Sequence, residues 1–159
     1  QTCALPICCL SDKELARYRR QKVGFVFQQY NLIPVLNVKE NIELPLKLDN
    51  KKIDKEYIED LINLLGLKER KNHLPNQLSG GQQQRVAIAR ALSAKPSIIL
   101  ADEPTGNLDS KTTEEVMDLL KSSIKKYNQT LIIITHNENI ARKADRIISI
   151  IDGELKLTL

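Results

Sequence analysis

Short apolar runs alternate with amphipathic stretches along the chain. Three runs of strand length, at 23–27, 97–101 and 131–135, are typical of strands buried on both faces of a parallel sheet. An amphipathic helical pattern joins the last two runs, so this part is predicted to be a right-handed βαβ unit. We expect Ser110 or Thr112 to cap its helix.

The region between the first and second runs has a helical pattern. Residues 31–92 show no strand pattern and look like a helical insertion. Within it, Asn37 begins a brief helix that Pro45 is predicted to end. Asp54 then caps a longer amphipathic helix that Gly66 stops.

Short elements are predicted at both ends of the chain. Ser11 and Glu14 have the spacing of a capping box in front of a short helix. Towards the other end, a short helix over 139–144 precedes an antiparallel hairpin, in which 146–151 and 155–159 flank an Asp-Gly turn. Together these patterns predict an α/β fold.

Composition limits the classes of protein that fit. The 159 residues are 42% hydrophobic, which is enough for the core of one domain and too little for two. The formal net charge is +4, but basic and acidic residues are interleaved, which indicates a solvated surface and excludes a dedicated nucleic-acid face. No apolar run reaches the 18 or more residues that a membrane-spanning helix needs.

Residues 1–10 differ in composition from the rest of the chain, and they hold all three cysteines. The cysteine-free remainder suits a reducing compartment. The chain begins with Gln1 instead of methionine. We interpret 1–10 as a foreign or artefactual segment and 11–159 as part of a domain.

The helix that ends the insertion opens with Ser79, Gly80, Gly81 and Gln82. Unpaired N–H groups and the positive end of the helix dipole make such a start a phosphate-binding surface. Ser79 is expected to be the N-cap, and the two glycines let a ligand approach the main chain. An ordinary capped helix after a turn is the alternative.

Polar side chains follow all three predicted strands. Asp102 and Glu103 end the second strand, Gln28 follows the first and His136 the third. Adjacent carboxylates are costly to desolvate unless they hold a cation or a water molecule. The carboxyl edge of a parallel sheet is where open α/β folds bind ligands, so we expect these residues to meet there. A strand that simply exits into a polar turn is the alternative.

In this order the motifs resemble those of the nucleotide-binding subunit of ABC transporters, of the type that serves lipoprotein release, macrolide export and antimicrobial-peptide export. The run 101–110 points to this exporter-like branch. The matches are the signature motif at 78–82, the Walker B strand at 98–102, the catalytic glutamate Glu103, the Q-loop Gln28, the D-loop at 107–109 and the switch histidine His136.

The resemblance implies ATP hydrolysis at a dimer interface. The catalytic roles then fall to Glu103, which polarises the attacking water, to His136, which contacts the γ-phosphate, and to Gln28. Asp102 would hold Mg²⁺ through water, and Gln28 would sense it. The residues implied to bind the nucleotide are Ser79, Gly80, Gly81, Gln82 and Asp109.

The implied fold is an α/β, P-loop NTPase-like parallel sheet with an α-helical subdomain. The subdomain and signature helix would occupy 31–92, and the Walker B, D-loop and switch core 93–159. The sequence holds no G-x-x-x-x-G-K-[ST], so the fold is expected to be incomplete, without its first strands and P-loop. We expect the isolated chain to be inactive and to show no saturable MgATP binding in calorimetry.

The implied partners are a second nucleotide-binding subunit and a transmembrane permease, with no nucleic acid. The permease would hold the protein at the cytoplasmic face of the membrane. One alternative is a non-catalytic subunit that donates its signature motif in trans. Another is a soluble ABC ATPase of repair or translation. A repair protein would carry heptads between Gln28 and Leu78, which are absent, and a translation protein would carry two domains in tandem.

Overall fold

The computed structural model describes residues 10–152 and 154–156. The elements follow one another along the chain as α1 (Asp12–Lys22), β1 (Val23–Phe27), α2 (Val38–Leu48), α3 (Lys55–Leu64), two 3-10 turns (Lys68–Arg70 and Pro75–Gln77), α4 (Gly80–Ser93), β2 (Ile98–Asp102), α5 (Ser110–Lys126), β3 (Thr130–Ile134), α6 (Glu138–Ala141), β4 (Ser149–Ile151) and β5 (Glu154–Lys156).

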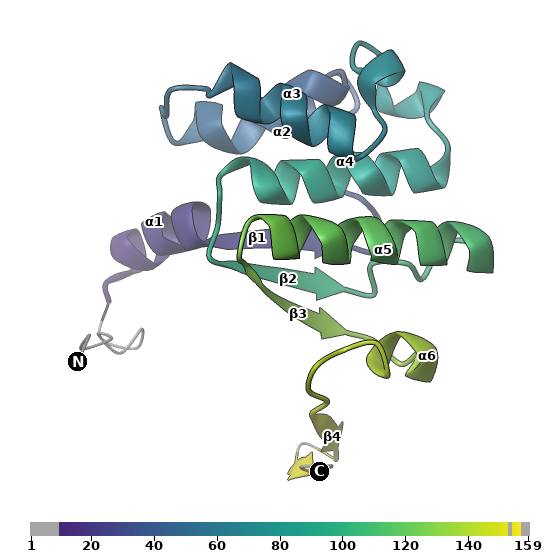
Figure 1. Ribbon diagram of the computed structural model, residues 1–159. Helices are drawn as coiled ribbons and strands as arrows, with labels where there is room; N and C mark the ends of the chain where they lie inside the picture. The colour runs from purple at the N-terminus through teal and green to yellow at the C-terminus, as the bar shows by residue number, and fades with distance from the viewer. Residues whose placement is uncertain (1–9, 153, 157–159) are drawn as a thin grey trace.

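Strands β1, β2 and β3 form a parallel sheet in that order, and β4 pairs with β5 as a separate antiparallel hairpin (Figure 1). The register places Phe27 beside Asp102 and Asp102 beside Ile134. The three strands therefore end at the same level. The helix α5 joins β2 to β3, so the predicted βαβ unit is present.

Helices α4 and α5 lie side by side on one face of the sheet, and α2 and α3 lie on the outer side of α4 (Figure 1). The core runs through these layers, from Ile58 and Leu61 on α3, through Ile88 and Leu92 on α4, to Ile99 on β2. Because α4 contacts both α2 and β1, it belongs to both layers. The division of the chain between residues 92 and 93 stays a prediction.

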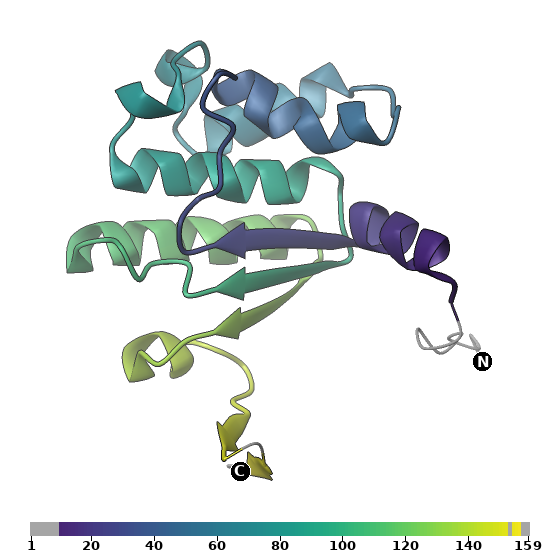
Figure 2. The same cartoon turned by 180° about the vertical axis from the view of Figure 1, so that it is seen from behind.

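The other face of the sheet is open in the described part of the chain, as Figure 2 shows from behind. Phe25 and Phe27 stack there with ring centroids 5.8 Å apart and are each 38% exposed, and Ile134 is 62% exposed. The expected burial of both faces is therefore wrong here. The runs carry apolar residues for two faces, but the described helices cover only the face of Ile99 and Ala101.

Pro45 lies inside α2, which continues to Leu48, so the predicted end of this helix was wrong. A proline lacks its N–H donor and its ring crowds the carbonyl four residues earlier, but the Pro45 carbonyl still accepts from the N–H of Asp49 at 3.3 Å. Ile42 and Leu46 are buried on the inner face of the same helix. Packing of this face outweighs the lost hydrogen bond.

The cap of α5 is Asp109, and neither Ser110 nor Thr112 fills this position. One Asp109 carboxylate oxygen accepts from the Thr112 N–H at 3.0 Å, and the other accepts from the Thr112 hydroxyl at 2.6 Å. Ser110 is already the first helical residue. An aspartate at the N-cap is as favourable as a serine, and Thr112 adds a second bond to it.

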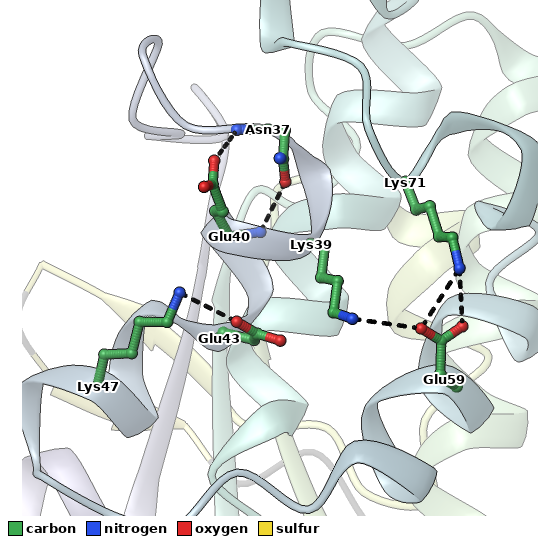
Figure 3. A network of polar contacts seen from close by, with 7 residues as sticks. All are labelled: Asn37, Lys39, Glu40, Glu43, Lys47, Glu59 and Lys71. Atoms are coloured by element: carbon green, nitrogen blue, oxygen red, sulfur yellow. Dashed lines mark hydrogen bonds and ion pairs between the residues drawn. The ribbon is translucent and has the colours of Figure 1, made fainter.

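Polar contacts hold the outer helices together (Figure 3). Glu59 on α3 lies 3.5 Å from the ammonium groups of both Lys39 on α2 and Lys71. The segment around Lys71 also caps α2, because the carbonyls of Lys71 and His73 accept from the N–H groups of Lys39 and Val38 at 3.1 and 3.0 Å. These contacts fix the start of α2 against the 71–73 loop.

Some predicted elements are shorter in the structure. The short helix α6 ends at Ala141, and β4 begins at Ser149, three residues after the predicted start of the hairpin. Gly153, 157–159 and most of the 1–10 segment lie outside the described residues. Within the described residues, every helix is too short or too polar to cross a membrane.

Candidate functional site

The polar residues that follow the three strands meet at one edge of the sheet, as predicted. Gln28, Glu103 and His136 line a single cavity of about 360 Å³. Its other walls come from the 105–110 turn, from α5 and from α6. The equal ends of the three parallel strands bring these side chains together, although they are far apart in sequence.

Glu103 has a strained backbone at this edge. Its φ is +42°, in the left-handed region that residues with a Cβ seldom adopt. Its N–H donates to the carbonyl of Ile134 at 2.9 Å, which continues the sheet pairing by one residue. Such strain costs about 1–3 kcal/mol, persists only where the surroundings impose it, and clusters at functional sites.

The Glu103 carboxylate accepts three hydrogen bonds from the segment after β3. Its Oε1 accepts from the backbone N–H of His136 at 2.8 Å and lies 2.7 Å from the ring Nδ1 of the same residue. Its Oε2 accepts from the Thr135 hydroxyl at 3.1 Å. The Glu103 side chain is 20% exposed, whereas that of His136 is 88% exposed. Glu103 is thus held in place, and the far side of the histidine ring faces outward.

Two opposing effects set the pKa of Glu103. Burial is the largest single effect and raises this pKa. The hydrogen bonds from the His136 backbone, the His136 ring and the Thr135 hydroxyl lower it, and their combined effect is larger than that of burial. The net result is a pKa below the ordinary value for glutamate. Glu103 is therefore a charged acceptor at neutral pH.

The contribution of Glu103 to the free energy of unfolding is expected to disappear in acid. Because its pKa is lowered in the folded state, this contribution is fully present above the ordinary glutamate pKa of about 4.3 and is lost as the pH falls through the lowered value. The stabilities of the native protein and Glu103→Gln in urea should therefore differ most above about pH 5, and the difference should shrink as the pH falls through the lowered pKa of Glu103. A difference that stays constant over this range would contradict the assignment.

Gln28 is held by the turn that follows β2. Its Nε2 donates to Asn107 Oδ1 at 3.3 Å, and Asn107 Nδ2 donates to the Gln28 carbonyl at 3.1 Å. A Cβ at Gly106 would lie 2.7 Å from Gln28 Nε2, so only glycine leaves room for this approach. The positioning roles of Asn107, Gly106 and Thr135 were missed by sequence reasoning, and nothing in their spacing indicates them.

Asp102 lies at the same edge, at the end of β2, but its exposed side chain is not among the residues that line the cavity. Carboxylate and amide oxygens are ligands that Mg²⁺ accepts, and it is typically bound through one or two carboxylates plus substrate phosphates. Asp102 and the amide oxygen of Gln28 fit that donor set. The described residues contain no group of three metal-binding side chains.

Ser79 caps α4, as predicted. Its hydroxyl accepts from the N–H of Gln82 at 3.3 Å, and the Gln82 side chain accepts from the N–H of Ser79 at 3.0 Å. The first N–H groups of a helix have no intrahelical acceptor. The Ser79 hydroxyl accepts from only one of these N–H groups. A helix start with further N–H donors is the kind of site that can bind phosphate.

The two glycines of this motif face other parts of the same chain. A Cβ at Gly81 would lie 2.5 Å from Cγ2 of Thr112, and one at Gly80 would lie 2.9 Å from the Tyr30 hydroxyl. Gly81 is buried. The absent side chains therefore allow close packing within this chain, and the approach of a ligand to the main chain stays a prediction.

The structure places the candidate residues in two groups. Gln28, Glu103 and His136 line the cavity, whereas the motif at 79–82 and Asp109 do not. Leu108 connects the two groups, because it lines the cavity and its Cδ2 lies 3.5 Å from the Cβ position of Gly80. The described contacts do not bring the start of α4 to the Glu103 carboxylate.

Comparison with known proteins gives consistent matches. The sequence model described as "ABC transporter" matches residues 9–106. The ABC transporter ATP-binding protein MJ0796 of Methanocaldococcus jannaschii is 53% identical over 154 residues, covering 92% of this chain and 65% of that protein. The lipoprotein-releasing system ATP-binding protein LolD of Cytophaga hutchinsonii is 46% identical over 149 residues, covering 92% and 68%.

Solved structures agree with these matches. The dimeric structure of MJ0796, an ABC transporter cassette, superimposes with a TM-score of 0.79 at 50% identity, over 92% of this chain and 66% of that one. A post-hydrolysis state of the same cassette, bound to ADP and Pi, also gives a TM-score of 0.79. The chain spans 65% of the length of MJ0796 and 66% of the length of a second ABC transporter ATP-binding protein of M. jannaschii, MJ1508.

Proposed function

Because this chain belongs to the ABC transporter family, we propose that the protein is an ATP-binding subunit that hydrolyses ATP to power transport by an exporter-like ABC transporter. The predicted family and the predicted α/β fold are both confirmed by the matches above. The observation that carries the proposal is the Glu103–His136 pair, held beside Gln28 in one cavity at the ends of three parallel strands.

We assign the roles within this cavity from its contacts. Glu103 polarises the attacking water, since its carboxylate is charged and fixed by Thr135 and His136. The His136 ring, bonded to Glu103 through Nδ1 and otherwise exposed, would donate from Nε2 to the γ-phosphate when both ring nitrogens carry a proton. Asp102, at the end of β2 and outside the cavity lining, would hold Mg²⁺ through water, and Gln28 would sense the ion. The ion would supply positive charge that offsets the charge of the β- and γ-phosphates.

The second group of residues completes the site of another subunit. Ser79, Gly80, Gly81 and Gln82 start α4 away from the cavity, and Asp109 lies at the nearby turn. We propose that Ser79, Gly80, Gly81 and Gln82 bind the nucleotide held by a second nucleotide-binding subunit. Two observations support a dimer: the separation of the two groups, and the dimeric state of the MJ0796 cassette structure. The Asp109 carboxylate accepts from Thr112 and caps α5 in this chain, so we propose that Asp109 orients the turn.

We further propose a transmembrane permease as partner, with the protein on the cytoplasmic face of the membrane. The proposal is supported by the similarity to LolD, an ATP-binding protein of a lipoprotein-releasing system. Exposed apolar side chains in the loop after Gln28, Ile33 and Val35, suit such a contact.

The experiment that tests the function is phosphate release from MgATP by the full-length protein, alone and with its permease in vesicles. We expect hydrolysis that saturates with ATP and stops when EDTA removes the magnesium. Hydrolysis should rise when the permease is present. A full-length protein that releases no phosphate from MgATP, with or without the permease, would refute the proposal.

A further inference from the structure

The loop that leaves the cavity after Gln28 has an unfavourable backbone. Tyr30 and Asn31 have φ values of +59° and +48°, so two consecutive residues with side chains lie in the left-handed region. Asparagine tolerates this conformation, but tyrosine seldom adopts it. Contacts with the rest of the molecule must therefore impose it.

Arg90 on α4 supplies such contacts. Its Nη1 donates to the carbonyl of Asn31 at 2.6 Å, and its Nη2 donates to the carbonyl of Tyr30 at 2.8 Å. Burial lowers the pKa of this guanidinium, but arginine stays charged in proteins. The planar fork of an arginine binds two acceptors at once, which a lysine ammonium does not do with the same geometry.

The same loop also reaches the start of α4. The Tyr30 hydroxyl lies 2.9 Å from the Cβ position of Gly80. Tyr30 therefore contacts α4 at two places. Its hydroxyl lies at Gly80, at the start of the helix, and its carbonyl accepts from Arg90. Figure 2 shows the segment after β1 crossing α4 on its way to α2. The loop is fastened to α4, the helix that opens with the motif at 79–82.

We propose that Arg90 is a positioning residue for hydrolysis, which fastens the 30–31 backbone to α4 and thereby fixes Gln28 in the cavity. Gln28 lies two residues before the first carbonyl that Arg90 binds. Without this anchor the loop relaxes out of its left-handed conformation, and the bonds between Gln28 and Asn107 loosen. The inference rests on the proposed ATP hydrolysis.

A double-mutant cycle tests whether Arg90 acts through Gln28. In the full-length protein, Arg90→Lys should lower kcat about tenfold and leave KM for ATP within about twofold. In a Gln28→Ala background the same substitution should change kcat by less than about twofold, because the side chain that Arg90 positions is gone. Arg70→Lys is the matched control, since Arg70 is exposed and its Nη1 lies 3.1 Å from a ring nitrogen of His73, a residue outside the 30–31 loop.

A second readout does not depend on activity. Hydrogen exchange at the backbone of 29–33 should become faster in Arg90→Lys, and exchange within α5 should stay unchanged. Equal loss of kcat in both backgrounds would overturn the inference and make Arg90 merely structural. Unchanged hydrogen exchange at 29–33 in Arg90→Lys would also overturn the inference. If the native protein hydrolyses no ATP, the proposed function fails, and the exchange measurement still decides whether Arg90 holds the loop.

Discussion

Glu103→Gln is expected to lower kcat for ATP hydrolysis by about 10²–10⁴-fold, the usual contribution of a general base. The substitution keeps the size of the side chain and removes the charged oxygen that accepts from His136 at 2.8 Å. Phosphate release by the full-length protein measures the effect. Glu56→Gln is the control, since Glu56 is an exposed glutamate on α3. A variant of Glu103 that keeps half of the native rate would show that another group activates the water.

The same substitution separates an enzyme from a subunit that only donates its motif in trans. In a mixed dimer with a related subunit that hydrolyses ATP, Glu103→Gln can be placed on either side. We expect a loss of hydrolysis when the full-length form of this subunit carries the substitution, because the Glu103–His136 contact is intact at 2.7 Å. If only the substitution in the other subunit matters, this chain is non-catalytic. Urea unfolding at neutral pH shows whether a lost rate reflects lost folding.

Asn41→Leu is expected to lower the free energy of unfolding by about 3 kcal/mol, because it leaves several buried polar groups without a partner. Asn41 is fully buried on α2. Its Oδ1 accepts from the N–H of Ile33 at 2.8 Å, and its Nδ2 lies 2.8 Å from the carbonyl of Leu36. The same amide also reaches the carbonyls of Asn37 and Ile33.

Asn63→Leu is the matched control for this prediction. Asn63 is an exposed asparagine on α3, and exposed substitutions typically change stability by less than about 0.5 kcal/mol. Urea titration of both variants gives the comparison. A loss below about 1 kcal/mol for Asn41→Leu would mean that the 33–37 loop rearranges to satisfy its own carbonyls.

Local signals predicted the strands and most helix starts. The runs at 23–27, 97–101 and 131–135 differ from β1, β2 and β3 by at most one residue at each end. Ser79 and Asp54 cap α4 and α3 as expected. Such features depend on a few neighbouring residues. The meeting of Gln28, Glu103 and His136 was also predictable, since parallel strands place their ends at one edge.

Contacts between distant residues were not predictable. Arg90 and Asn31 are 59 positions apart, and no spacing indicates that one binds the other. The packing of Gly81 against Thr112 and the hold of Asn107 on Gln28 depend equally on side-chain directions. The open face of the sheet was not predicted either. An apolar run indicates that both faces of a strand favour burial, but it does not show which other part of the molecule covers each face.

The position of α4 between two layers limits how its sequence can vary. Buried positions of this helix include Gly81, Gln84, Ile88 and Leu92, and most of its remaining residues touch the loop after β1 or another helix. A surface helix can exchange residues on its outer side freely, but α4 has little outer side. Over evolutionary time, substitutions should accumulate in α3 and in the exposed part of α5 long before they are tolerated in α4.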